Sequence, residues 1–215
     1  MQDGLLPLFP LNLVLLPKAT LPLHIFEDRY KEMIGGVVEN QQEFGIVLAG
    51  DGGVVNTGCT ATVDRVVEQY PDGRMDIIVK GQRRFELLLL NDQKPYLRGA
   101  VEFFEDIQPE DPPSPQVLAR VIRAYEDWQE FDRTRAERET PDHAPELNDP
   151  LLSFQIARTV PDLTFRQMLL STRSEAERLK QIAEFLPGFL AKQRLVAHIK
   201  EVAPKNGHGK RHVDE

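Results

Sequence analysis

The feature that most constrains the fold of this chain is an apolar run between residues 5 and 33 that proline interrupts repeatedly. Pro7, Pro10, Pro17 and Pro22 stand among leucine, valine and phenylalanine residues, and the run then gives way to charged side chains. Proline has a fixed φ and no backbone N–H, so it disrupts helix interiors and central strands. We therefore expect short extended pieces with corners at the prolines, buried on both sides and followed by a helix.

Up to about residue 105 the pattern is that of strands separated by turn residues. Alternating or continuous apolar residues are bounded by glycine, proline and aspartate, which favour turns for different steric reasons. Residues 28–40 instead carry apolar side chains at helical spacing, so one helix is expected within this half. The expected strands cover residues 44–49, 59–67, 75–80, 84–90 and 96–104.

A proline-rich acidic stretch at residues 107–115 separates this half from a helical one. Such a composition is typical of a stiff connector and marks the expected domain boundary. Beyond it the apolar period becomes helical, with Trp128 on a buried stripe and Phe131 expected at the surface. We expect the Pro187-Gly188 pair to kink or break the last helix. Helices are expected at residues 117–128, 151–159, 164–171, 174–186 and 189–199.

The expected organisation is therefore a β-rich subdomain at residues 1–108, which contains one helix, and a helical subdomain at residues 116–202. Residues 203–215 are polar and are expected to form a disordered tail. Strands followed by helices, rather than alternating with them, indicate the α+β class.

Composition and charge argue against several classes of protein. The 215 residues are 41% hydrophobic and 28% charged, as in ordinary globular proteins. The net charge of −8 argues against nucleic-acid binding, which relies on clustered lysine and arginine. No segment approaches the roughly 20 apolar residues of a membrane span, and the N-terminus lacks the basic region of a secretory signal. A single cysteine, Cys59, excludes an intramolecular disulfide and suits a reducing compartment, so we expect a cytoplasmic protein without a membrane partner.

The candidate chemical motifs are each better explained by structure. The glycine-rich run at residues 50–53 lacks the spacing of a dinucleotide-binding loop and is expected to be a turn. Cys59 has no histidine nearby in the sequence and is expected to be a buried, unreactive thiol. His24 is expected to be a packed or hydrogen-bonded core residue, and His208 and His212 stand in a glycine-broken tail. No metal site and no cofactor are therefore predicted.

Several short motifs together resemble the Lon N-terminal domain family, the substrate-recognition region of Lon-type ATP-dependent proteases. The resemblance covers about residues 5–200, and its most specific part is the spacing of proline and glutamate in the opening segment. The motifs are Leu6-Pro7-Leu8-Phe9-Pro10-Leu11, Pro22-Leu23-His24-Ile25-Phe26-Glu27 with Arg29-Tyr30 and Met33, Gly58-Cys59, Gly81 with Arg84-Phe85, Pro95-Tyr96, Leu152-Ser153-Phe154-Gln155-Ile156-Ala157, and the segment from Leu169 to Leu186.

The resemblance implies a PUA-like β-rich pseudo-barrel followed by a small α-helical bundle, in agreement with the α+β order. It also implies a non-enzymatic role in recognising unfolded or extended polypeptides. Glu27, Gly81 and Pro22 are given structural roles. An ion pair of Glu27 with Arg84 or Arg83 would lock the first helix to the barrel, and a solvated helix start is the equal alternative. Family position suggests polypeptide contacts at Phe26, Arg29, Tyr30, Arg84, Phe85, Pro95 and Tyr96.

The sequence carries no motif for nucleotide hydrolysis. No G-x-x-x-x-G-K-[ST] phosphate loop is present, and the Gly209-Lys210 pair is followed by Arg211. The chain also leaves no room for a Ser/Lys protease domain, so we expect polypeptide recognition without an ATPase or protease module. Two alternatives stay open: an adaptor or regulatory subunit for a separate ATP-dependent protease or ATPase, and a PUA-type reader of a small ligand or RNA.

Overall fold

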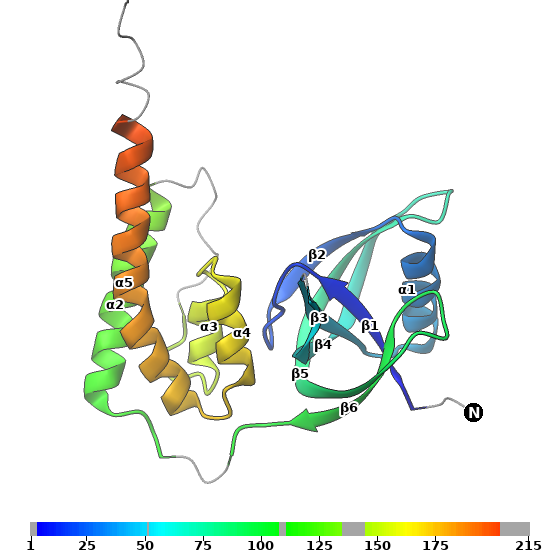
Figure 1. Cartoon of the computed structure of the whole chain (residues 1–215), viewed down its shortest axis with the longest axis horizontal. Helices are drawn as coiled ribbons and strands as arrows, with labels where there is room; N and C mark the ends of the chain where they lie inside the picture. Colours follow the sequence, from blue (N-terminus) through cyan, green and yellow to red (C-terminus); the bar gives the residue numbers. More distant parts are fainter. Residues whose placement is uncertain (1–3, 51, 108–110, 135–144, 203–215) are drawn as a thin grey trace, which may run out of the picture. The chain divides into compact units, whose positions relative to one another are not determined.

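The computed structural model describes residues 4–50, 52–107, 111–134 and 145–202 (Figure 1). Six strands form one mixed sheet within these residues: β1 Leu6–Leu11, β2 Thr20–Ile25, β3 Phe44–Gly50, β4 Gly53–Gln69, β5 Met75–Asn91 and β6 Arg98–Phe104. The strand order is β2-β5-β4-β3-β1-β6, and an additional pairing of β5 with β6 closes most of the sheet into a barrel. β1 and β3 run parallel, and the other paired strands run antiparallel.

The proline-interrupted opening segment folds into two short strands and a helix, as expected. β1 and β2 each span six residues, and α1 follows at Asp28–Asn40. Two details differ from the expectation. β1 has a paired strand on each edge, β3 on one and β6 on the other. Its pairing with β6 is confined to Leu6 and Pro7, so the missing N–H of Pro10 interrupts no hydrogen bond to β6. In the described part of the chain β2 pairs with β5 alone, and its alternate side chains are exposed rather than buried.

β5 organises the barrel because it spans 17 residues and pairs with three other strands. The first part of β5 pairs with β2 and the later part with β6, while β4 follows the opposite edge. The expected interruption at Gly81 is absent, because the strand continues through this residue. A Cβ at Gly81 would collide with the carbonyl of Leu16, and the Gly81 N–H donates to the Ala19 carbonyl at 2.8 Å. Glycine here allows the loop after β1 to lie directly on the strand.

The expected turn between β3 and β4 is present as a hairpin. Gly50 and Gly53 are register partners at its tip, and residue 51 lies outside the described residues. The two strands that follow differ from their expected lengths. β4 is longer at both ends than the expected 59–67, and β6 begins at Arg98 rather than at residue 96.

Four further helices occur in the described residues: α2 Pro115–Arg133, α3 Leu152–Ala157, α4 Leu163–Ser171 and α5 Glu175–Val202. The chain divides into two compact units, one of residues 1–110 and 148–175 and the other of residues 111–147 and 176–215. The first unit contains the barrel, α1, α3 and α4, and the second contains α2 and all but the first residue of α5. No described helix is both long and apolar enough to cross a membrane.

This division differs from the sequence-based ranges, which place α3 and α4 in a helical subdomain at residues 116–202. The structure groups these two helices with the barrel. A hydrogen bond from Gln167 Nε2 on α4 to the Thr57 carbonyl on β4, 2.9 Å long, is one of the contacts responsible. Helical periodicity shows that a segment has a buried face but not which unit covers that face. The expected tail at residues 203–215 lies outside the described residues.

Aromatic contacts hold α2 beside α5 in the second unit (Figure 1). Trp128 is buried as expected, with its ring centroid 5.4 Å from that of Phe189. Phe131 is half-buried rather than exposed, because its ring packs 5.9 Å from Trp128. α5 continues through Pro187, so of the expected kink or break the break is absent. Phe185 and Phe189 stack across the proline with centroids 5.3 Å apart, and this packing opposes the roughly 3 kcal/mol that an interior proline costs a helix.

Candidate functional site

The residues suggested as polypeptide contacts lie in three separate places on the barrel unit. Phe26, Arg29 and Tyr30 mark the junction of β2 and α1. Phe26 is 60% exposed and stacks on His24 with ring centroids 5.9 Å apart. Tyr30 is buried with its ring 4.1 Å from that of Phe9, and the Arg29 guanidinium lies 4.5 Å above the Tyr30 ring. Of these three side chains, Phe26 and Arg29 face solvent.

The ion pair considered between Glu27 and Arg84 or Arg83 is not formed. The Glu27 carboxylate instead forms an ion pair with Arg29: it accepts a hydrogen bond from Nε at 2.9 Å and lies 2.7 Å from Nη2. Arg83 pairs with Glu43, with Nη2 and Oε2 2.9 Å apart. Glu27 precedes α1 as its N-cap residue without a side-chain capping bond, so the half-exposed helix start is the alternative that the structure favours.

Arg84 is buried and joins three segments of the barrel unit. Its side chain is 6% exposed, and Nη2 lies 2.5 Å from Asp106 Oδ1. Nη1 donates to the carbonyls of Thr172 at 2.7 Å and Leu170 at 3.3 Å, at the end of α4. The ring of Phe104 lies 4.8 Å from the guanidinium carbon. Arg84 therefore has a packing role, and its burial argues against the suggested polypeptide contact.

Phe85 is also buried, in the core of the barrel beside Leu8 and Val47. Two glycines on neighbouring strands leave space for its ring, since a Cβ at Gly45 would approach the ring to 2.8 Å and one at Gly58 would come closer still. The aromatic ring thus occupies the volume that side chains at these positions would fill. Phe85 is unavailable to a partner in the folded barrel.

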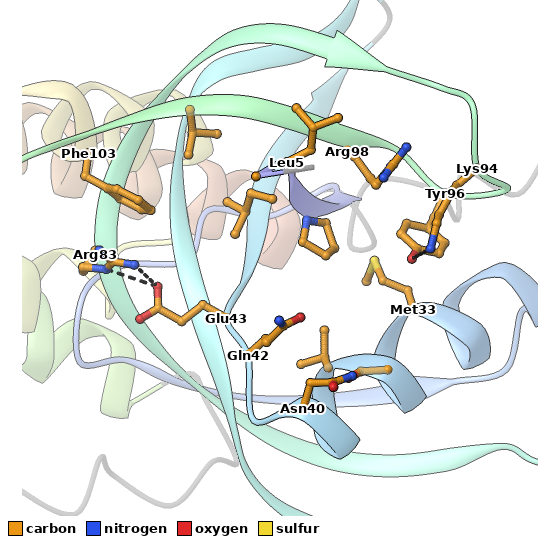
Figure 2. A pocket seen from close by; sticks show the side chains of 16 residues that line it. Leu5, Met33, Asn40, Gln42, Glu43, Arg83, Lys94, Tyr96, Arg98 and Phe103 are labelled. Carbon is orange, nitrogen blue, oxygen red and sulfur yellow. Dashed lines mark hydrogen bonds and ion pairs between the residues drawn. The ribbon is translucent and has the colours of Figure 1, made fainter. Parts of the chain in front are cut away.

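Pro95 and Tyr96 lie in the connection between β5 and β6, next to a cavity of about 610 Å³. Pro95 is exposed, whereas Tyr96 is 8% exposed and forms part of the cavity wall. Tyr96 is the one suggested contact that lines this cavity, which we call the α1–β6 cavity (Figure 2). Its lining residues are Gly4, Leu5, Leu6, Pro7, Met33, Gly36, Val37, Asn40, Gln42, Glu43, Arg83, Lys94, Tyr96, Arg98, Val101 and Phe103.

The α1–β6 cavity combines an apolar surface with charged groups. Leu5, Leu6 and Pro7 come from the start of the chain and β1, and Met33 and Val37 come from α1. Figure 2 shows the side chains of Arg83 and Phe103 at one side of the cavity and those of Lys94, Tyr96 and Arg98 at the other. A concave apolar surface with a few polar groups is the usual form of a ligand site.

At one side of the cavity the charge of Arg83 is neutralised. Its Nη2 and Nε lie 2.9 and 3.2 Å from Glu43 Oε2. The Arg83 guanidinium also lies 3.7 Å above the ring of Phe103, at the distance of a cation–π contact. These contacts hold Arg83 in place and compensate its positive charge.

At the other side the positive charge of Lys94 has a neutral neighbour. Lys94 Nζ donates to Tyr96 Oη at 3.0 Å, and this hydrogen bond is the main reason that the pKa of Lys94 is raised. Arg98 Nη2 donates to the amide oxygen of Asn91 at 3.0 Å. Lys94 is consequently a cation throughout the physiological pH range.

A second polar cluster forms where β2 pairs with β5. His24 is opposite Asp76 in the register, and Nδ1 lies 2.6 Å from Asp76 Oδ1. The Tyr70 hydroxyl lies 2.7 Å from Asp76 Oδ2 and 3.0 Å from Glu68 Oε2. Hydrogen bonds from Tyr70 and then His24 lower the pKa of Asp76, and the two carboxylates raise the pKa of Tyr70 to about 12. His24 is thus hydrogen-bonded as expected, but it is exposed rather than in the core.

The remaining reactive group, the Cys59 thiol, is buried as expected. Burial raises its pKa to about 12, so the nucleophilic thiolate is disfavoured. Across the described ranges no group of three or more histidine, cysteine, aspartate or glutamate side chains is placed to hold a metal ion.

Comparison with known families identifies the class of protein to which this fold belongs. Residues 5–187 match the family described as the ATP-dependent protease La (LON) substrate-binding domain. Because the match covers most of the 215 residues, the chain belongs to the Lon substrate-binding domain family. The barrel and the cavity described above are therefore features of a member of that family.

Individual relatives agree with this assignment. Lon protease of Parabacteroides distasonis is 33% identical over 49% of this chain, and Lon protease 2 of Herpetosiphon aurantiacus is 26% identical over 93% of it. This chain spans 14% and 26% of those two proteins, respectively. The crystal structure of a Lon N-terminal domain protein from Xanthomonas campestris aligns with 85% of this chain and 99% of its own, at a TM-score of 0.67 and 24% identity. The N-terminal domain of the Mycobacterium avium complex Lon protease aligns with 85% of this chain and 98% of its own, at a TM-score of 0.62 and 18% identity. The two structures confirm the fold.

Proposed function

We propose that this chain is a polypeptide-recognition module that binds unfolded or extended segments in the α1–β6 cavity. The family match over residues 5–187 is the observation that carries the proposal, since the family is described as a substrate-binding domain. The cavity supports it chemically. An unfolded polypeptide exposes apolar side chains, and burying one of them against Leu5, Met33 and Val37 removes apolar surface from water.

The cavity is a better candidate than the open edge of β2. An exposed edge strand can pair with an extended peptide through main-chain hydrogen bonds. Within the described residues β2 pairs with β5 alone, so it offers such an edge next to the exposed Phe26. Pro22 stands in the middle of this strand, however, and proline on an edge strand is a common means of preventing strand addition.

Recognition by this unit requires no chemistry of its own. We assign residues 5–187 a role in binding a client polypeptide, and we assign no catalytic residue to them. Proteolysis of a bound client would then depend on an ATPase and a protease module acting with this one. An adaptor role beside a separate ATP-dependent protease is the alternative form of the same proposal.

Two adjacent glycines on α1 allow the cavity to be blocked with a matched control. A Cβ would meet no atom within 4 Å at either Gly35 or Gly36, and Gly36 lines the cavity whereas Gly35 does not. Gly36→Leu places a side chain at the cavity, and Gly35→Leu makes the same change of helix propensity outside it. We expect Gly36→Leu to raise the Kd for reduced casein by about tenfold, equivalent to about 1.4 kcal/mol, and Gly35→Leu to leave it unchanged.

Fluorescence anisotropy of labelled reduced casein, titrated with each protein, measures these constants. Circular dichroism first establishes that both variants keep the wild-type fold. The proposal fails if the wild-type protein does not bind casein at high micromolar concentration. It also fails, for this cavity, if the two leucine variants bind equally well.

A further inference from the structure

The strand β6 has an open edge where it borders the α1–β6 cavity. One edge of β6 pairs with β5 from Arg98 to Phe104, whereas the other edge pairs with β1 only at Arg98 and Gly99. In the described part of the chain no strand continues the ladder on that second edge toward Phe104. Val101 and Phe103 lie on this unpaired stretch, and both line the cavity. The cavity therefore adjoins a sheet edge as well as side chains.

The hydrogen bonding between β1 and β6 shows which main-chain groups of β6 face the open edge. The Leu8 N–H donates to the Leu97 carbonyl at 2.8 Å, in line with the β1–β6 register. In an antiparallel ladder hydrogen-bonded pairs alternate with pairs that are not, so the groups of residues 97, 99, 101 and 103 face this edge. The alternation is uninterrupted because the register shift between β5 and β6 adds its extra residue to β5. The N–H and C=O of Val101 and Phe103 thus point to the open edge, and those of Glu102 point to β5.

The start of the chain departs from this edge just before it would cover it. If the register of β1 continued, Gly4 would lie opposite Val101. Gly4 has a φ of +66°, in the left-handed region rather than in the extended region of a strand. Among the described residues, no group hydrogen-bonds to the edge-facing N–H and C=O of Val101 and Phe103. Unpaired main-chain groups of this kind are a template for a further strand.

The edge suits a short polypeptide segment. Residues 98–104 contain no proline, so every residue of β6 retains its N–H, whereas Pro22 interrupts the donors of the β2 edge. Phe103 is 41% exposed, so this end of the strand is accessible to a partner. Two edge-facing residues are too few to hold a second copy of the chain, because a stable interface buries roughly 1,200–2,000 Å².

From this geometry we propose that an extended client segment adds to the open edge of β6 as a short antiparallel strand and exchanges main-chain hydrogen bonds with Val101 and Phe103. The client side chains opposite these two residues share their face of the sheet and enter the α1–β6 cavity. The inference rests on the proposed function and specifies its clients. They are segments in the extended conformation, recognised through the main chain, with apolar side chains two positions apart.

N-methylated peptides test the main-chain hydrogen bonds. The parent peptide is acetyl-Thr-Gln-Leu-Thr-Leu-Gln-Thr-amide, in which the leucines have the required spacing. One derivative is N-methylated on both leucines, and the matched control is N-methylated on the central threonine and the glutamine that follows the second leucine. Each loses two N–H donors and keeps every side chain. We expect the first to bind at least about tenfold more weakly than the parent and the control to bind within about twofold of it, as measured by isothermal titration calorimetry.

Amide hydrogen exchange, measured by NMR on the wild-type protein, locates the bonds on β6. In the free protein the N–H groups of Val101 and Phe103 should exchange faster than that of Glu102, which is bonded to β5. With the parent peptide at about ten times its Kd, exchange at Val101 and Phe103 should slow by about tenfold. Exchange at Glu102 and along β2 should stay the same.

Several outcomes overturn the inference. Equal binding of the two methylated peptides does so, as does unchanged exchange at Val101 and Phe103 in the saturated complex. Protection that appears along β2 instead would assign the client to that edge. Protection of Val101 and Phe103 that grows with protein concentration alone, together with a dimer in sedimentation, would assign the edge to a second copy. Casein binding without parent-peptide binding at millimolar concentration refutes this inference alone, whereas absence of casein binding refutes the proposed function.

Discussion

At the scale of single residues, environment decides what neighbouring side chains can do. Arg83 and Arg84 are adjacent in β5, yet Arg83 has a half-exposed side chain and lines the α1–β6 cavity while Arg84 is buried between strands and α4. The two aromatic residues Tyr30 and Tyr96 are both buried, but only Tyr96 contributes to the cavity wall. Alternation along a strand sends successive side chains to opposite faces, which is why Arg83 and Arg84 diverge.

The Tyr70 cluster leads to a prediction about pH. The neutral phenol donates to Asp76 and Glu68, so ionising it is disfavoured and its pKa is raised from 10.0 to about 12. Because the pKa of Tyr70 is raised in the folded state, the hydrogen bonds of the neutral phenol stabilise the fold. This stabilisation is fully present below pH 10 and is lost as the pH rises from 10 to 12. We expect Tyr70 to remain protonated at pH 11, where ordinary tyrosines are ionised.

NMR of protein labelled with ¹³C at tyrosine Cζ measures this titration, and Tyr70→Phe assigns the resonance. Asp76→Ala removes the largest cause of the shift and should return the midpoint toward 10. Asp64→Ala, which removes an exposed carboxylate of β4 that is close to Arg65, is the matched control and should leave it near 12. A Tyr70 midpoint near 10 in the wild-type protein would contradict the hydrogen-bonding scheme.

At the scale of elements, local patterns identified helices and strands well where flanking residues reinforced them. α1 occupies the expected 28–40, because a charged start and apolar side chains at helical spacing act together. The long β5 strand was expected as two pieces because Gly81 is a common breaker, but here it makes room for a crossing loop. A kink or break was expected at Pro187, and α5 does not break there because aromatic packing in the second unit supports it. Both differences arise from tertiary contacts that a local pattern does not contain.

The connection between β5 and α4 is expected to depend on Arg84. Arg84→Met preserves much of the side-chain volume but leaves the Asp106 carboxylate and two carbonyls of the α4 end without this donor. Removing one partner of a buried ion pair destabilises a protein by about 3–5 kcal/mol. We expect a decrease of this size in the free energy of unfolding, measured by urea denaturation followed by circular dichroism.

Arg83→Met is the natural control for this measurement. It removes the preceding arginine, whose side chain is 54% exposed and pairs with Glu43. Exposed ion pairs contribute about 0–1 kcal/mol, so the control should be nearly as stable as the wild-type protein. If both variants lose the same amount of stability, Arg84 does not hold the elements together as described.

At the scale of the whole molecule, the family and fold could be predicted from the sequence, while most of the site could not. The proline-interrupted opening segment is specific enough to identify the Lon substrate-binding domain family, which the comparisons confirm. The α1–β6 cavity, however, is assembled from the chain start, α1, β5, the β5–β6 connection and β6. Tyr96 was among the suggested contacts, but Lys94 and Arg98 were missed because no local pattern distinguishes them from ordinary surface cations. Strand pairing and barrel closure bring these segments together.

The central claim is that a client polypeptide enters the α1–β6 cavity, and a methionine on α1 provides a direct probe of it. The chain contains four methionines, of which Met33 lines the cavity while Met75 and Met168 do not. In a methyl-labelled protein, NMR spectra recorded during titration with reduced casein should show the Met33 methyl resonance shifting or broadening, with Met75 and Met168 little changed. A casein-dependent change at Met75 or Met168 with Met33 unaffected would contradict the account.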